Sequence, residues 1–211
     1  MKKLILIVLS LFTICGCTNI KNESISSLTK EIAVSVDEYN TVRTGFKYYL
    51  PVGLVVDKTT LYNEVIKSTN YTYYLYVDVI SYYNKTQNTY EKNENAYYSE
   101  ELKSKDKFGY IEINLKENNQ YLIEIMFNYA KIEVMVDYED INLAVDYAVS
   151  ILRSIEYNDN IIANILGEDI LNYQEEVYNI FNTTSSDSIY LKYEEADKNQ
   201  ETEEKDEDLI S

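Results

Sequence analysis

Carboxylates and tyrosines are the side chains of this chain that could carry chemistry. The sequence holds 36 Asp and Glu, 23 Tyr, two Cys and no His. Without histidine, neither a Ser-His-Asp or Cys-His arrangement nor a histidine metal site can form. The sequence also has no glycine-rich phosphate loop and indicates no cofactor. Chemistry based on carboxylates alone, such as glycoside hydrolysis by two acids at a set separation, stays open.

The strongest local pattern is the alternation of polar and apolar residues within 108–136, which predicts a three-stranded antiparallel meander. Opposed residues on neighbouring strands must share a face of the sheet. A three-residue loop at Glu117-Asn118-Asn119 satisfies this rule, because it sets Ile113 against Ile123. A two-residue turn at Asn128-Tyr129 satisfies it for the second connection.

This register sets Glu112, Glu124 and Glu133 side by side on one face of the sheet. Like charges directly opposed are destabilising in water. A bound Ca²⁺ with oxygen ligands would relieve the repulsion, which makes the three glutamates a candidate metal site. The alternative is a solvated face whose charges splay apart, helped by Lys131 diagonally across.

Residues 62–83 predict a β-hairpin with its turn at Ser68-Thr69-Asn70. The return arm, YTYYLYVDVISYY at 71–83, has six tyrosines in thirteen positions and is rich in β-branched residues, which favours a strand. A helix over 60–67 is the competing interpretation of the first arm. Alternation gives the return arm one apolar face suited to a core, formed by Tyr73, Leu75, Val77 and Val79.

The other face of the return arm is a candidate ligand surface formed by Tyr74, Tyr76, Asp78 and Tyr82. A carboxylate buried among tyrosines can have a raised pKa, and aromatic planes beside an acid can bind sugars. The alternative is an Asp78 hydrogen-bonded to a tyrosine hydroxyl beneath a covering helix or loop, since buried polar groups are normally satisfied.

The N-terminus has a charged segment, an apolar segment and a cysteine in the order that is typical of exported, lipidated proteins. Lys2 and Lys3 precede an apolar run, Leu4 to Ile14, that is shorter than the ~20 residues of a membrane span. The sequence Ile14-Cys15-Gly16-Cys17 then resembles a bacterial lipobox. The resemblance implies that the signal peptide, residues 1–16, is removed and that Cys17 carries a diacylglycerol. A plain secretory peptide with an incidental cysteine is the alternative.

Composition excludes several partners. The formal charge is −17 and falls to −19 once Lys2 and Lys3 leave with the signal peptide. Such a chain is repelled by nucleic acid phosphates and by anionic lipid headgroups. Attachment to the membrane must therefore come from the acyl chains of Cys17, because two lipid chains anchor stably where one does not.

The remaining N-terminal half predicts one helix, one strand and one loop. Apolar residues close to helical spacing predict a short helix over 28–39, capped by Ser26 or Ser27. Residues 45–54 predict a strand that Pro51 stops. Residues 84–106 are polar and predict a loop with little regular structure.

The C-terminal half predicts two helices. Asp140 caps an amphipathic helix whose apolar stripe is Ile141, Ala144, Val145, Ala148, Ile151, Leu152 and Ile155. Asn158 or Asp159 starts a shorter helix that Gly167 ends. Apolar residues continue over 169–181 without a decisive period.

The predicted organisation is one α+β domain, 28–182, in which a central mainly antiparallel sheet packs against helices. A tether, 17–27, precedes the domain. An acidic disordered tail, 183–211, follows it, since 194–211 carries nine Asp or Glu against two Lys.

The order of these elements resembles the PsbP-like α/β/α sandwich. The resemblance covers 45–157 and rests on the strand FKYYLPVG at 46–53, the meander, and the helix that closes on ILRSI at 151–155. It implies an extrinsic, often membrane-associated protein that helps to assemble or stabilise a larger complex and has no enzymatic activity.

The expected function is therefore that of a lipid-anchored protein on the extracytoplasmic face of the cell membrane. We expect it to bind or scaffold another envelope component without catalysis, and a protein partner is favoured over a small ligand. The alternative is a carboxylate-dependent hydrolase that acts on envelope glycans.

Overall fold

A computed structural model describes residues 20, 23–34, 36, 38–86 and 89–169. The predicted signal peptide, Cys17, the apolar residues after 169 and the acidic tail lie outside the described residues. Among the described residues, no helix is long and apolar enough to cross a membrane.

The described chain combines two β-sheets with several short helices and one long helix. The helical elements are α2 (Ile25–Lys30), η2 (Glu31–Ala33), α3 (Val79–Asn84), η3 (Glu117–Asn119), η4 (Tyr138–Asp140), α4 (Ile141–Arg153) and α5 (Asp159–Asp169). The strands are β1 (Thr41–Arg43), β2 (Phe46–Tyr48), β3 (Val55–Thr59), β4 (Asn63–Lys67), β5 (Thr72–Val77), β6 (Tyr98–Ser104), β7 (Lys107–Leu115), β8 (Gln120–Phe127), β9 (Ala130–Asp137) and β10 (Glu156–Tyr157).

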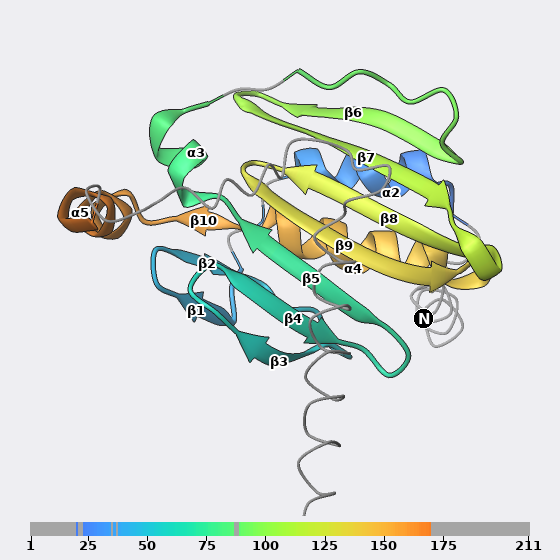
Figure 1. The fold of residues 1–211 in the computed structure, drawn as a ribbon, viewed down its shortest axis with the longest axis horizontal. Coiled ribbons are helices and arrows are strands. Elements are labelled where there is room, and N and C mark those ends of the chain that lie inside the picture. Colours follow the sequence, from blue (N-terminus) through green and yellow to red (C-terminus); the bar gives the residue numbers. More distant parts are fainter. Residues whose placement is uncertain (1–19, 21–22, 35, 37, 87–88, 170–211) are drawn as a thin grey trace, which may run out of the picture.

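Seven strands form the main sheet in the order β3-β4-β5-β9-β8-β7-β6, and every neighbouring pair is antiparallel. In Figure 1, α2 and α4 lie behind this sheet, while α5 lies at the left-hand end of the molecule. The predicted α+β class, with a mainly antiparallel sheet packed against helices, is confirmed.

The meander has the predicted register. Ile113 lies opposite Ile123, and Glu124 lies opposite both Glu112 and Glu133. Both connections contain residues at positive φ: Asn118 and Asn119 in the first, and Asn128 (φ 50°) with Tyr129 (φ 64°) in the second. Asparagine adopts this conformation readily, whereas tyrosine does so rarely. A two-residue turn with two positive φ angles matches the right-handed twist of its strands.

One face of the main sheet, the helix-covered face, forms the core with α4. Side chains from β5, β7, β8 and β9 meet the apolar stripe of α4, and Tyr73 contacts the ring of Tyr147 edge-on at 6.2 Å between centroids. The helix begins after Asp140 as predicted, but the Asp140 carboxylate accepts a hydrogen bond from the Tyr71 hydroxyl instead of capping the helix.

The structure corrects three predicted elements. Strand β5 ends at Val77, and the second half of the predicted return arm forms α3. Residues 98–104, inside the predicted loop, form the edge strand β6. The predicted first helix begins earlier and is shorter, because Ser24 caps α2 and helical geometry ends at Ala33.

The sequence also did not predict β1 or β3, which are exposed outer strands with weak alternation. The last helix begins as predicted at Asp159, and the side chain of Asn158 accepts a hydrogen bond from the backbone amide of Ile161. It continues past Gly167 to Asp169.

A small sheet in the order β1-β2-β10 is tied to the main sheet by a buried carboxylate. Glu64 on β4 accepts hydrogen bonds from the Arg43 side chain on β1 and from the Tyr48 hydroxyl on β2. Tyr48 is fully buried. Burial, reinforced by the Glu64 carboxylate, raises the pKa of Tyr48 far above its usual range, so its hydroxyl stays a donor.

We expect Glu64→Gln to destabilise the protein by about 2 kcal/mol, because the buried Glu64 carboxylate accepts two hydrogen bonds, one of them from the charged Arg43 side chain. Tyr48→Phe should cost only about 1 kcal/mol, because it removes one hydrogen bond and leaves the ion pair intact. Urea unfolding followed by circular dichroism measures both values. Equal costs for the two variants would contradict the importance of the ion pair.

Candidate functional site

The second face of the main sheet, opposite α2 and α4, carries the predicted row of glutamates. Glu112, Glu124 and Glu133 point to this face from three adjacent strands. All three are buried, and Glu124 and Glu133 have no exposed surface. The prediction of a solvated face is therefore wrong, because alternation fixes which side chains share a face but not what covers that face.

Lys131 supplies the positive charge within this row. Its ammonium nitrogen is fully buried, 2.7 Å from Glu133 Oε1 and 3.8 Å from Glu124 Oε1. It also lies 5.8 Å from the centre of the Tyr76 ring, within reach of a cation–π attraction. A buried carboxylate is tolerated only when it is paired or hydrogen-bonded, and Lys131 provides that pairing on β8 and β9.

Glu112 is held separately from the other two glutamates. Its carboxylate accepts hydrogen bonds from the Tyr90 hydroxyl at 2.9 Å, from Asn93 Nδ2 at 2.8 Å and from Asn114 Nδ2 at 2.8 Å. Among the described residues, no three acidic side chains are placed to hold a metal ion. The arrangement does not support the calcium interpretation, because a lysine and three polar groups occupy the positions around these carboxylates.

Glu124 is the least satisfied acid of the row. Neither of its carboxylate oxygens accepts a hydrogen bond from the part of the chain that the structure describes. The pKa of Glu124 is raised to about 7: burial is the main cause, Lys131 opposes it, and the Glu133 and Glu112 carboxylates add to it. Near neutral pH this side chain therefore exchanges a proton, and the charges of Glu124, Lys131 and Glu133 balance when it is protonated.

The four residues of the predicted ligand surface fall into two separate groups. Tyr74 and Tyr76 are buried on the second face, opposite Glu133 and Lys131 respectively. Asp78 does not share their face, because the strand ends before it. Its carboxylate caps α3 by accepting a hydrogen bond from the Ser81 backbone amide at 2.8 Å, so the prediction that placed it among the tyrosines is wrong.

Tyr82 belongs to an aromatic cluster at the end of the sheet, near α5. Its ring stacks on Tyr157 with centroids 3.9 Å apart, and it meets Tyr129 edge-on at 5.6 Å. Its hydroxyl donates to Asp159 Oδ1 at 2.6 Å, and Lys85 Nζ lies 3.7 Å from the ring centre. This cluster joins α3 to α5 and serves the packing of the fold.

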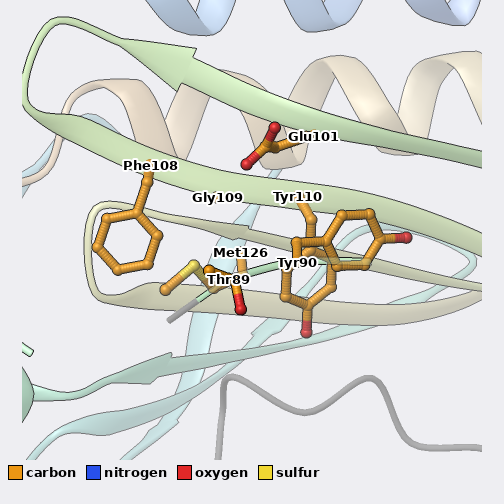
Figure 2. A pocket seen from close by; sticks show the side chains of 7 residues that line it. All are labelled: Thr89, Tyr90, Glu101, Phe108, Gly109, Tyr110 and Met126. Atoms are coloured by element: carbon orange, nitrogen blue, oxygen red, sulfur yellow. The ribbon is translucent and has the colours of Figure 1, made fainter. Parts of the chain in front are cut away.

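A small hollow opens on the second face between the residues before β6 and the strands β6 to β8. It is shallow and is lined by Thr89, Tyr90, Glu101, Phe108, Gly109, Tyr110 and Met126. Figure 2 shows the rings of Tyr90 and Tyr110 on one side, Phe108 on the other and Met126 between them. The two tyrosine rings stack with centroids 4.7 Å apart and an interplanar angle of 8°.

Gly109 lines the hollow where β7 and β8 approach each other closely. A side chain at this position would overlap the carbonyl oxygen of Met126, so β7 and β8 approach each other too closely there for any other residue. The sequence prediction missed the hollow because Tyr90 and Glu101 lie in the segment assigned to an irregular loop.

Three partly exposed tyrosines form a second surface that the sequence prediction missed. We call Tyr97, Tyr121, Tyr138 and the neighbouring Leu115 the tyrosine patch. Tyr97 meets Tyr121 at 5.1 Å and Tyr138 at 6.1 Å between ring centroids, both edge-on. The three rings come from the residue before β6, the start of β8 and the residue after β9, so only the fold brings them together.

No family model, no curated protein and no solved structure matches this chain. The PsbP-like resemblance of the body and the lipobox resemblance of the N-terminus therefore stay predictions from the residues alone.

The raised pKa of Glu124 predicts a pH dependence of stability. The folded state holds the proton up to about pH 7, whereas the unfolded chain releases it near pH 4.5. The free energy of unfolding therefore falls between these pH values, by on the order of 3 kcal/mol in total, at 1.36 kcal/mol per unit. Glu124→Gln should remove this fall and be more stable than the wild type at pH 8.

Urea unfolding at pH 5 and pH 8 measures the effect. Glu94→Gln is the control, because the Glu94 carboxylate is exposed, and it should keep the wild-type difference between the two pH values. If Glu124→Gln keeps the wild-type difference in the free energy of unfolding between pH 5 and pH 8, the difference does not come from Glu124.

Proposed function

We propose that the protein is anchored outside the cytoplasm by a lipid on Cys17 and binds another protein of the cell envelope without catalysing a reaction. The hollow on the second face is the observation that supports binding. It combines partly exposed aromatic surface at Tyr90 and Phe108 with one carboxylate, Glu101, at its rim. Aromatic residues are enriched in protein interfaces, which favours recognition at this place.

The size of the hollow favours a protein partner over a small molecule. Pockets for drug-sized ligands occupy roughly 300–1,000 Å³ and enclose most of the ligand. The hollow here is far smaller: it is a shallow depression with room for little more than one water molecule. It cannot enclose a ligand of drug size, whereas a side chain of a protein partner can lie across it. Because Glu101 is exposed at the rim beside aromatic rings, a Lys or Arg side chain of the partner is the best match.

A hydrolase that acts on envelope glycans is the second candidate, and the raised pKa of Glu124 is the observation that favours it. Glycoside hydrolysis uses two carboxyl groups, of which one has a raised pKa and acts as the general acid while the other is ionised. Both Glu124 and Glu133 have no exposed surface, however, and the hollow is not lined by either. Hydrolysis of envelope glycans by the wild type that disappears in Glu124→Gln would establish the enzyme.

We expect Cys17→Ala to release the protein from membranes, because the acyl chains supply the attachment and the net negative charge gives no attraction to anionic headgroups. Palmitate labelling followed by membrane fractionation measures both parts of this prediction. Cys15→Ala is the matched control, since it changes the neighbouring thiol and should leave labelling and fractionation unchanged. Retention of the unlabelled Cys17→Ala protein in the membrane fraction would contradict the anchor.

We expect Glu101→Lys to abolish capture of the partner, because it places a positive charge where the hollow offers a negative one. The experiment is a crosslinked pull-down of the lipidated protein from its native membrane. Glu94→Lys is the matched control: Glu94 and Glu101 each pair with a lysine two residues away, but Glu94 does not line the hollow. Equal capture by the two variants would contradict binding at this site.

A further inference from the structure

The tyrosine patch exposes apolar surface on a chain that is otherwise strongly acidic. Tyr97 is 47% exposed, Tyr138 is 60% exposed and Leu115 is 56% exposed. The rings of Tyr121 and Tyr138 lie 5.8 Å apart, which completes a mutually packed group of three. Side chains with an apolar ring and a polar hydroxyl favour the boundary between water and an apolar phase.

The patch lies at one end of the main sheet. Leu115 ends β7, Tyr121 is at the start of β8 and Tyr138 directly follows β9. In Figure 1 these strand ends lie at the right, whereas β1 and α5 lie at the left. The patch therefore occupies one end of the long axis of the molecule.

The N-terminal part of the described chain is fixed near the same end. Asn142, in the first turn of α4, donates its side-chain amide to the carbonyl oxygen of Glu23 at 2.7 Å and to that of Ile20 at 3.3 Å. Tyr138 precedes Asn142 by four residues. Cys17 precedes Ile20 by three residues, and three residues reach at most about 11 Å.

We propose that the tyrosine patch rests on the headgroup layer of the membrane to which Cys17 holds the protein. The proposal depends on the lipid anchor proposed above. An anchor within three residues of Ile20 brings this end of the sheet to the bilayer surface. Tyrosines are enriched at that depth in membrane proteins, where the ring contacts acyl chains and the hydroxyl stays hydrated. The patch thereby fixes the orientation of the folded domain relative to the membrane.

The surroundings of the patch favour a lipid surface over a protein as the occupant. Four residues make a small contact compared with the roughly 800 Å² that each partner buries in a stable protein complex. A shallow lipid contact needs less area, because the acyl chains already supply the attachment. Asp137 and Glu139 are exposed beside Tyr138, so neutral or zwitterionic headgroups suit the patch better than anionic ones.

The test compares the reactivity of cysteines placed at the two ends of the molecule. Leu115→Cys lies in the patch, and Val42→Cys is the matched control, 64% exposed on β1 at the opposite end. The mature lipoprotein is purified and reconstituted into phosphatidylcholine vesicles. Because Cys17 is then a thioether, the introduced cysteine is the only free thiol. A water-soluble maleimide should label Leu115→Cys several-fold more slowly on vesicles than in detergent, and Val42→Cys equally fast in both.

Equal labelling of the two variants on vesicles would overturn the proposal, and so would protection of Leu115→Cys in native membranes without protection in protein-free vesicles. The second result would assign the patch to a protein partner. A protein that does not bind vesicles and reacts at Cys17 itself would instead overturn the lipid anchor. Melting curves check that the variants fold, and Tyr138→Cys provides a second position in the patch if Leu115→Cys does not.

Discussion

The buried ammonium group of Lys131 is the interaction on which the second face of the sheet depends. It lies between carboxylates of two adjacent strands, at 2.7 Å from Glu133 and 3.8 Å from Glu124. Removing an ion from water costs several kcal/mol unless a partner of opposite charge compensates it. The same two strands bury Ile125 and Ile132 against α4 on their other face. The central strands thus carry an apolar core on one face and a charged one on the other.

The register of the meander could be predicted from the residues because each connection has one solution that keeps the faces consistent. A three-residue first loop pairs Ile113 with Ile123, whereas a two-residue turn would set Ile113 against Glu124, and asparagine supplies the positive φ angles of the loop. The position of the three glutamates followed from that register. Their burial did not follow, because local alternation describes two faces and says nothing about what covers each of them.

Other features escaped prediction for separate physical reasons. Strand β5 stops at Val77 because Asp78 caps a helix, and the β-branched and aromatic residues beyond it gave no sign of that change. Strand β6 carries charges because it lies at an edge, so its composition resembles that of a loop. The hollow at Gly109 and the tyrosine patch each join residues that are distant in sequence, and only the strand order brings them together.

Within the part of the chain that the structure describes, the two outer strands, β3 and β6, each have one edge without a neighbouring strand. Pairing between such edges is a route to aggregation. Irregular pairing between Val56 and Lys58 disturbs the first edge, and Glu101 with Lys103 charges the second. Two copies brought side by side would therefore not readily join their sheets edge to edge into one continuous sheet.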